Sequence, residues 1–216
     1  MRYLYLDWIG HLYIRPEFHF KYPGFGWVTM PPGNLLYLYF YCLGILSLMI
    51  AVGLFYRVST ILFFFGFSYF FLIESAFYLN HLYLVCLVSF LIIWIPLNRN
   101  YSLDAILFPK IKIHFLPCWY LWILRFQIGI VYFFGGIAKI ETDWLMGKPM
   151  GIWLKDRSEF PIVGEYFNES LVAIFYSWSG MIFDIFLPFA LLIKKIRMPA
   201  FLCAIIFHLH NQYFFT

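Results

Sequence analysis

The sequence predicts an all-α polytopic membrane protein with about six transmembrane helices and interfacial amphipathic segments. Its residues are 63% hydrophobic and 12% charged, whereas a soluble domain averages about 45–50% apolar and about 25% charged. Aromatic residues reach 25%, which suits belts of Trp and Tyr at the membrane surfaces. Most of its apolar runs are long enough to cross the hydrocarbon layer, which takes about 20 residues.

Residues 1–33 form the first predicted region, a segment that lies along the membrane interface. Prolines at Pro16, Pro23, Pro31 and Pro32 interrupt it too often for a span. One short amphipathic helix with turns suits this mixture of polar and aromatic residues. The segment lacks the clean apolar core and the small-residue cleavage site of a signal peptide.

Residues 34–216 form the second predicted region, a transmembrane helical bundle. Pro96 stops the third apolar run, and a long loop at 139–169 separates the fourth run from the fifth. That loop carries the sequence WLMGKPMGIWL, so we expect it to be interfacial or re-entrant. The six runs cover residues 35–55, 58–78, 82–95, 118–138, 170–193 and 198–215.

The distribution of basic residues predicts the orientation. Six spans place residues 1–33, the turn at 80–81, the 139–169 loop and the C-terminus on one side. Each side carries seven basic residues, but those of the opposite side lie in short loops with one acid, Asp104. Basic residues in short loops mark the cytoplasm, so the first side is predicted to be extracytoplasmic.

Several functional classes are disfavoured. The net charge of +4 is dispersed, and no basic run is longer than that at 194–197, so nucleic acid is not an expected partner. The four cysteines are isolated, without CxxC or Cys/His spacing, so we predict neither a metal site nor a disulfide framework. Neither a nucleophilic triad nor a Gly-rich phosphate loop is recognisable.

Lys139 is the residue around which the predicted site is built. It follows an apolar helical run and precedes Glu141, Asp143 and Trp144, which indicate a boundary between membrane and water. A lysine at this place is costly unless it is paired, hydrated or used in function. The simpler alternative is an ordinary lysine whose ammonium reaches out to water.

Other polar residues are predicted to reach the same side of the membrane as Lys139. Polar groups in a bilayer face the bundle interior or water, so we expect one pocket. Asn80 has an alternative role as a helix N-cap. His208 and His210 are two residues apart and point to different faces of a helix, so at most one is expected to face a shared site. The converging residues are Asn80, His81, Lys139, His208, His210 and Asn211.

Two further charged residues lie inside predicted spans. Arg125 lies just inside the fourth run and Asp184 lies within the fifth. Charged side chains in a membrane usually pair with one another. We therefore interpret Arg125 and Asp184 as a buried ion pair between two helices, with a structural role.

The predicted pocket suits an apolar substrate that enters from the bilayer, such as a quinone or hydroquinone. Burial lowers the pKa of a lysine, and a neutral lysine acts as a general base. Amides and imidazoles hydrogen-bond a developing oxyanion or carbanion. We assign binding of the quinone to Trp144, His210 and Asn211.

At these residues the sequence resembles the vitamin K-dependent gamma-glutamyl carboxylase family, through its HTTM-type membrane module. The order of the matching stretches agrees with that family, and the resemblance covers nearly the whole chain. The stretches are FHFKYPGFGWV at 18–28, YLNHLYL at 78–84, LRFQIGIVYFFGGIAKIETDWLMGKPM at 124–150 and FHLHNQYFF at 207–215.

The resemblance implies a reaction and roles for four residues. Lys139 falls on the catalytic lysine that deprotonates reduced vitamin K, whose anion reacts with O₂ to give a strong base. That base removes a gamma proton from a glutamate in a peptide or protein, and the carbanion captures CO₂. Asn80 and His81 fall on a pair near the carbanion and the quinone, and His208 falls on a histidine near the same site.

The sequence also departs from that family. Members usually have one span before the region matched here, and further spans with a large lumenal domain after it. Vertebrate members have two adjacent lysines where this chain has Ala138 and Lys139. A bacterial relative, a fragment or one product of a split reading frame are the expected explanations.

Three alternative functions stay open at this point. The first is a quinone-binding oxidase or epoxidase that does not carboxylate protein. The second is a bis-histidine haem protein using His81 with His208 or His210, which leaves Lys139 unexplained. The third is an inactive truncated membrane module.

Overall fold

The computed structural model describes residues 2–113, 115–161 and 163–215. These residues form ten α-helices and, within the same ranges, no strand, which confirms the predicted all-α class. The chain divides into two compact units, Met1–Leu124 and Arg125–Thr216.

Among the described residues, four helices are long and apolar enough to cross a membrane: α2 (Gly33–Val52), α3 (Tyr56–Ile73), α6 (Trp119–Ile137) and α9 (Ser170–Leu192). This number suits a multi-pass membrane protein. The other two predicted spans are helices as well, but one is shorter and the other more polar. The helix α4 (Asn80–Trp94) has 15 residues, fewer than a bilayer needs. The helix α10 (Arg197–Phe215) has several polar residues in its second half.

In the first unit, Asp104 in α5 (Leu103–Leu107) holds the start of α3. Its carboxylate accepts hydrogen bonds from the amides of Phe55 at 2.7 Å and Tyr56 at 2.9 Å, and from Asn98 Nδ2 at 2.8 Å. Burial alone raises the pKa of Asp104, but these three hydrogen bonds outweigh it and lower the pKa below its ordinary value. The carboxylate therefore satisfies amides that the first turn of a helix leaves without partners.

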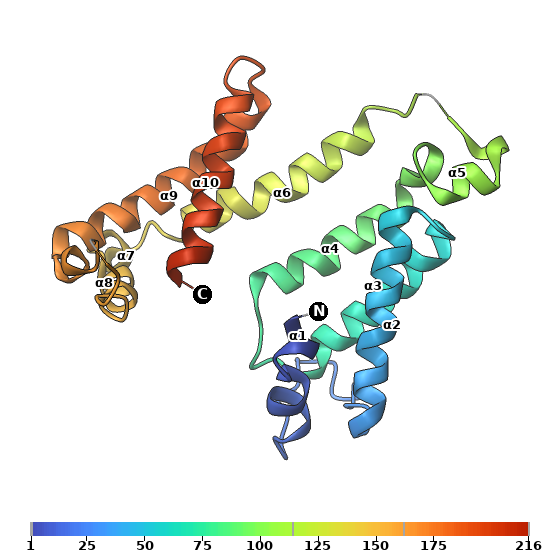
Figure 1. Cartoon of the computed structure of the whole chain (residues 1–216), viewed down its shortest axis with the longest axis horizontal. Helices are drawn as coiled ribbons and strands as arrows, with labels where there is room; N and C mark the ends of the chain where they lie inside the picture. The colour runs from blue at the N-terminus through green and yellow to red at the C-terminus, as the bar shows by residue number, and fades with distance from the viewer. Residues whose placement is uncertain (1, 114, 162, 216) are drawn as a thin grey trace. The chain divides into compact units, whose positions relative to one another are not determined.

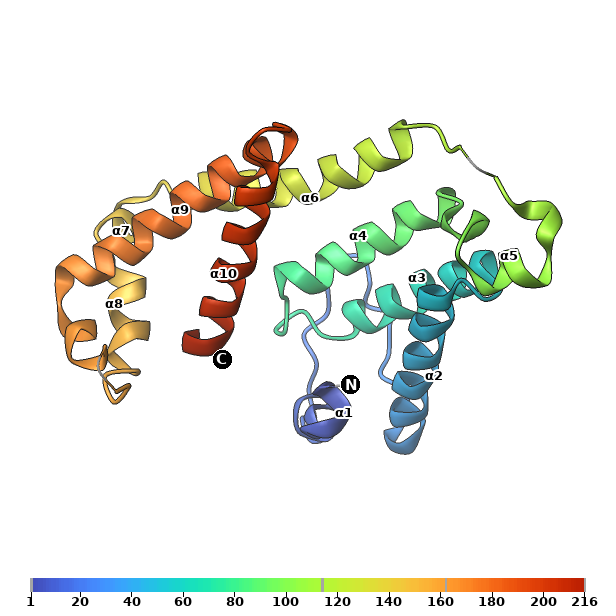
Figure 2. The same ribbon diagram turned by 45° about the horizontal axis from the view of Figure 1, so that its top comes forward.

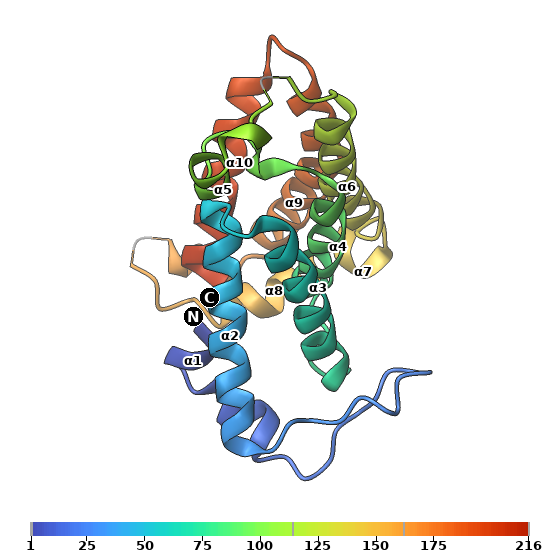
Figure 3. The ribbon, with the colours of Figure 1, turned by 90° about the vertical axis from the view of Figure 1, so that its right-hand side faces the viewer.

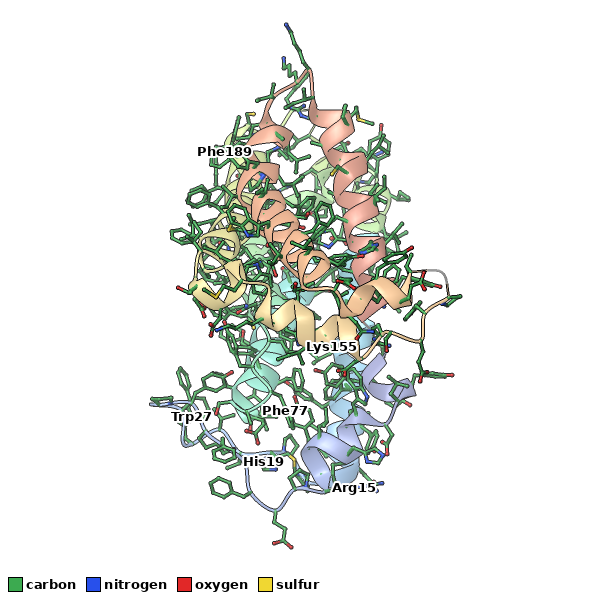
Figure 4. All side chains as sticks on the ribbon, turned by 90° about the vertical axis from the view of Figure 1, so that its left-hand side faces the viewer. Arg15, His19, Trp27, Phe77, Lys155 and Phe189 are labelled. Carbon is green, nitrogen blue, oxygen red and sulfur yellow. The ribbon has the colours of Figure 1, made fainter. Side chains whose placement is uncertain are left out.

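The N-terminal segment belongs to the first unit and packs against α2 and α3. It contains α1 (Arg2–Tyr5), a π-helix (Ile9–Ile14) and a long loop that leads to α2 (Figure 3). Glu74 fixes this loop by accepting hydrogen bonds from His19 Nδ1 and the amide of Phe20, both at 3.0 Å. Figure 4 shows His19 and Phe77 at the same end of this unit. Whether residues 1–33 lie at a membrane interface stays a prediction.

The long 139–169 segment of the second unit contains local structure. It forms α7 (Thr142–Leu145), α8 (Lys148–Lys155) and a 3₁₀-helix (Gly164–Asn168). Gly147 joins α7 to α8 with φ of 72°, and a Cβ there would lie 2.7 Å from the amide nitrogen of Ile174. Only glycine allows this close approach, which brings α7 and α8 against the first half of α9 (Figures 1 and 2).

The end of α6 crosses α9 at Gly136. A Cβ at Gly136 would lie 2.5 Å from Ile185 Cγ1 and 2.8 Å from its amide nitrogen. Small residues allow helix backbones to approach this closely in membrane proteins. Because of this contact, the C-terminal end of α6 lies beside Asp184 and Ile185, past the middle of α9. This offset between the two helices determines which side chains meet there.

Candidate functional site

The second unit contains a cavity of about 920 Å³. Ligand pockets commonly have volumes of about 300–1,000 Å³, mostly apolar walls and a few polar groups. Five of the predicted site residues line it: Lys139, Trp144, His208, His210 and Asn211. The other lining residues are Met150, Trp153, Asp156, Arg157, Phe175, Tyr176, Ser179, Gly180, Asp184 and Phe207.

Lys139 reaches this cavity from the turn after α6. Its Nζ donates hydrogen bonds to Asp184 Oδ2 at 2.5 Å and to the carbonyl of Gly135 at 3.2 Å. The Lys139 side chain is 24% exposed and that of Asp184 is 15% exposed. The ammonium is therefore held inside by a carboxylate and does not extend freely into water.

Trp144, in α7, is held beside the lysine. Its indole Nε1 donates to the carbonyl of Ser177 at 2.8 Å, and its ring centroid lies 5.4 Å from Lys139 Nζ. That distance lies within the range of a cation–π contact. Trp144 thus forms an aromatic wall with a set position next to the charged pair.

Asp184 does not pair with Arg125, the partner predicted from the sequence. The contact of Gly136 with Ile185 sets the offset between α6 and α9. Arg125 lies eleven residues before Gly136, or about 16 Å along the helix, which is too far for its side chain to reach Asp184. The expected Arg125–Asp184 pair is therefore wrong, and Lys139 takes the place of Arg125.

His208 hydrogen-bonds with a residue that the sequence did not single out. Its Nε2 lies 2.5 Å from the hydroxyl oxygen of Tyr132 in α6, and the two ring centroids are 5.9 Å apart. Tyr132 lies seven residues before Lys139, two helical turns away. If the helical spacing of α6 is continued to Lys139, the two residues fall on the same side, and this spacing is the signal by which Tyr132 could have been identified from the sequence.

His210 contacts a different set of aromatic rings from those around His208. Its ring centroid is 5.5 Å from that of Tyr176 and 4.5 Å from that of Phe214. Both His208 and His210 line the cavity, so the expectation that at most one would face it is wrong. With about 100° between successive residues, the two histidines lie at opposite edges of one broad face of α10, and Phe207 and Asn211 lie between them.

Asn80 and His81 belong to the first unit. Both are exposed at the start of α4. The N-cap position of this helix belongs to Leu79, and no side chain caps it, so the alternative role of Asn80 as an N-cap is wrong. Their convergence with Lys139 stays a prediction.

The cavity combines one ion pair, two imidazoles and an amide with several aromatic rings. Such a site can bind a flat apolar molecule and exchange a proton with it. Within the described ranges, no three or more His, Cys, Asp or Glu side chains are grouped so as to hold a metal ion.

Comparison with known proteins gives a family for this chain. No solved structure matches the chain. A family model for the HTTM domain matches residues 1–216. The chain is therefore a member of the HTTM domain family.

Proposed function

We propose that this chain binds a reduced quinone in the cavity of its second unit and removes a proton from it. The observation that carries the proposal is the Lys139–Asp184 pair, which borders a cavity with aromatic walls. The HTTM domain is shared with gamma-glutamyl carboxylase, which supports reduced vitamin K as the substrate. The full reaction would be oxygen-dependent epoxidation of reduced vitamin K coupled to carboxylation of glutamate.

In this proposal Lys139 acts as the general base. In its neutral form the Lys139 amine accepts the proton of the hydroquinone hydroxyl and becomes an ammonium. Asp184, whose Oδ2 lies 2.5 Å from Nζ, holds that ammonium in place. The resulting oxyanion lies next to this cation, which stabilises it.

The carboxylation step is assigned to residues of the first unit. His81 and Asn80 would stabilise the glutamate carbanion before it captures CO₂. A peptide or protein that contains glutamate is the proposed partner, and an extracytoplasmic site is proposed from the loop charges.

An alternative is a quinone oxidase or epoxidase that does not carboxylate protein. It requires only the cavity of the second unit with its Lys139–Asp184 pair. The haem alternative is weaker, because His208 Nε2 would have to give up its hydrogen bond with Tyr132 to bind iron.

The proposal is tested with the protein in lipid nanodiscs supplied with reduced vitamin K and O₂. Lys139→Ala should abolish epoxide formation while leaving membrane insertion unchanged, and small amines should partly restore the reaction. Lys148→Ala is a matched control, because Lys148 forms an ion pair of similar length, at 2.6 Å to Asp143, on an exposed surface. Equal epoxidation in both variants would refute the base assignment.

A second variant separates the two proposed activities. His81→Ala should keep epoxide formation but reduce CO₂ incorporation into a glutamyl peptide by about 10²–10³-fold, as expected for a lost hydrogen bond to developing charge. Equal loss of both reactions would assign His81 to quinone binding. Epoxidation without carboxylation in the native chain would favour the oxidase or epoxidase, and neither reaction would indicate an inactive module.

A further inference from the structure

Three residues of α9 follow one wall of the cavity. Tyr176, Gly180 and Asp184 all line it. They are four residues apart, so they lie on one face of the helix at intervals of about 6 Å. Gly180 therefore occupies the middle of this wall, one turn from the carboxylate that pairs with Lys139.

Gly180 leaves an open space that helix packing does not explain. A Cβ there would meet no atom within 4 Å, whereas a Cβ at Gly136 or Gly147 would lie within 3 Å of neighbouring atoms. Those two glycines allow parts of the protein to approach each other closely. Glycine inside a helix is less favourable for helix stability than alanine. Gly180 therefore lowers the stability of α9 without allowing a close packing contact in return.

Two aromatic residues that line the same cavity, Trp144 and Phe207, are held in place by other contacts. Trp144 is hydrogen-bonded to the carbonyl of Ser177. Phe207 stacks on Phe183 with ring centroids 3.8 Å apart and an angle of 18° between the planes. These contacts fix two of the aromatic walls of the cavity.

We infer that Gly180 is a specificity-determining residue and that the flat ring of the ligand lies against it. A glycine lets a ligand approach the helix backbone closely. A ring at this position directs a hydroxyl substituent toward Asp184 and Lys139, about one helical turn away. The inference rests on the proposed function and adds to it the place in the cavity where the ligand ring lies.

The test measures binding of tritiated menadione, a naphthoquinone without a tail, held in its reduced hydroquinone form under anaerobic conditions, to the full chain in nanodiscs. Gly180→Ala, Gly180→Val and Gly180→Leu fill the space stepwise. Each added methylene in a binding pocket is worth about 10- to 200-fold in discrimination between ligands. We therefore expect Gly180→Leu to bind menadione at least about tenfold more weakly, with smaller losses for valine and alanine.

Gly44→Leu is the matched control. Gly44 lies inside α2, and a Cβ there would also meet no atom within 4 Å. This variant should bind menadione as the native chain does, and its helix content and thermal stability should match those of the Gly180 variants. If Gly180→Leu does not insert, the alanine and valine variants decide, because alanine adds only a methyl group.

The outcomes separate this inference from the proposed function. Equal menadione affinity across the Gly180 series would overturn the role of Gly180, and the epoxidation test of Lys139 would be unaffected. Graded loss of binding in a chain that makes no epoxide would support the ring site and refute the proposed reaction. A native chain that binds neither reduced menadione nor reduced phylloquinone would overturn both.

Discussion

Lys139 Nζ lies 2.5 Å from Asp184 Oδ2, in an ion pair that joins the end of α6 to the second half of α9. A charge placed after an apolar helix is costly unless it has a partner or a function. The structure gives it a partner inside the cavity, so Lys139 is not simply a lysine that reaches out to water. The pair is also a structural link between two helices, which makes its loss measurable as a change in stability.

Asp184→Asn should destabilise the protein more than Asp143→Asn. The Asp184 side chain is 15% exposed and that of Asp143 is 56% exposed, although the two lysine–carboxylate distances are similar. Loss of the shielded partner should cost about 1–3 kcal/mol, whereas an exposed pair contributes about 0–1 kcal/mol. Thermal unfolding in detergent measures both, and equal shifts would contradict the importance of shielding.

Gly136→Ala should push α6 away from α9 and weaken the Lys139–Asp184 pair. The added Cβ would meet the backbone of Ile185, which cannot move aside as a flexible side chain does. Overpacking of this kind costs about 1–3 kcal/mol. Gly129→Ala on the same helix is the control, because its Cβ would lie 3.5 Å from Pro188 in ordinary contact. A Gly136→Ala protein as stable as the control would show that the helix crossing can relax.

Tyr132→Phe and His208→Ala should not have additive effects. The tyrosine hydroxyl lies 2.5 Å from the imidazole Nε2, and residues in one hydrogen bond show coupling energies of about 0.5–3 kcal/mol. Phenylalanine keeps the aromatic ring of Tyr132, so this change removes the hydroxyl alone. The free energies of unfolding of the two single variants and the double variant give the coupling energy. A value near zero would mean that the hydrogen bond contributes nothing to stability.

Asp104 should make the stability of the first unit depend on pH in the acid range. Hydrogen bonds hold its pKa in the folded protein below its ordinary value, so folding is favoured by the ionised form. This contribution is fully present above the unfolded pKa of about 3.9 and is lost as pH falls through the folded pKa. Asp104→Asn should reduce the dependence. The measurement is the unfolding free energy of the native chain and of Asp104→Asn between pH 7 and strongly acidic pH. The same pH dependence in both would mean that Asp104 has no such role.

The positions of the helices were largely predictable from local sequence. The predicted runs at 118–138 and 170–193 became α6 (Trp119–Ile137) and α9 (Ser170–Leu192). Backbone groups in hydrocarbon must be paired within the segment, so a long apolar run has to form a helix. Lys139 was recognisable for a related reason, because a charge next to such a run is costly.

The contacts inside the site were less predictable. The sequence suggested Arg125 as the partner of Asp184 and gave Tyr132 no role, although five of the predicted residues do line the cavity. Helical spacing tells which residues share a face, but it does not tell how far one helix is shifted along another. The actual offset between α6 and α9 places Lys139, and not Arg125, beside Asp184.

The sequence by itself determined the all-α class, the apolar runs and the chemical groups available to a site, because these depend on residue type and spacing within one segment. The tertiary structure decided that Lys139 meets Asp184, that His208 meets Tyr132 and that the space over Gly180 stays open. The physical reason is the offset between α6 and α9. Close packing at Gly136 sets that offset, and such packing joins residues that are distant along the chain.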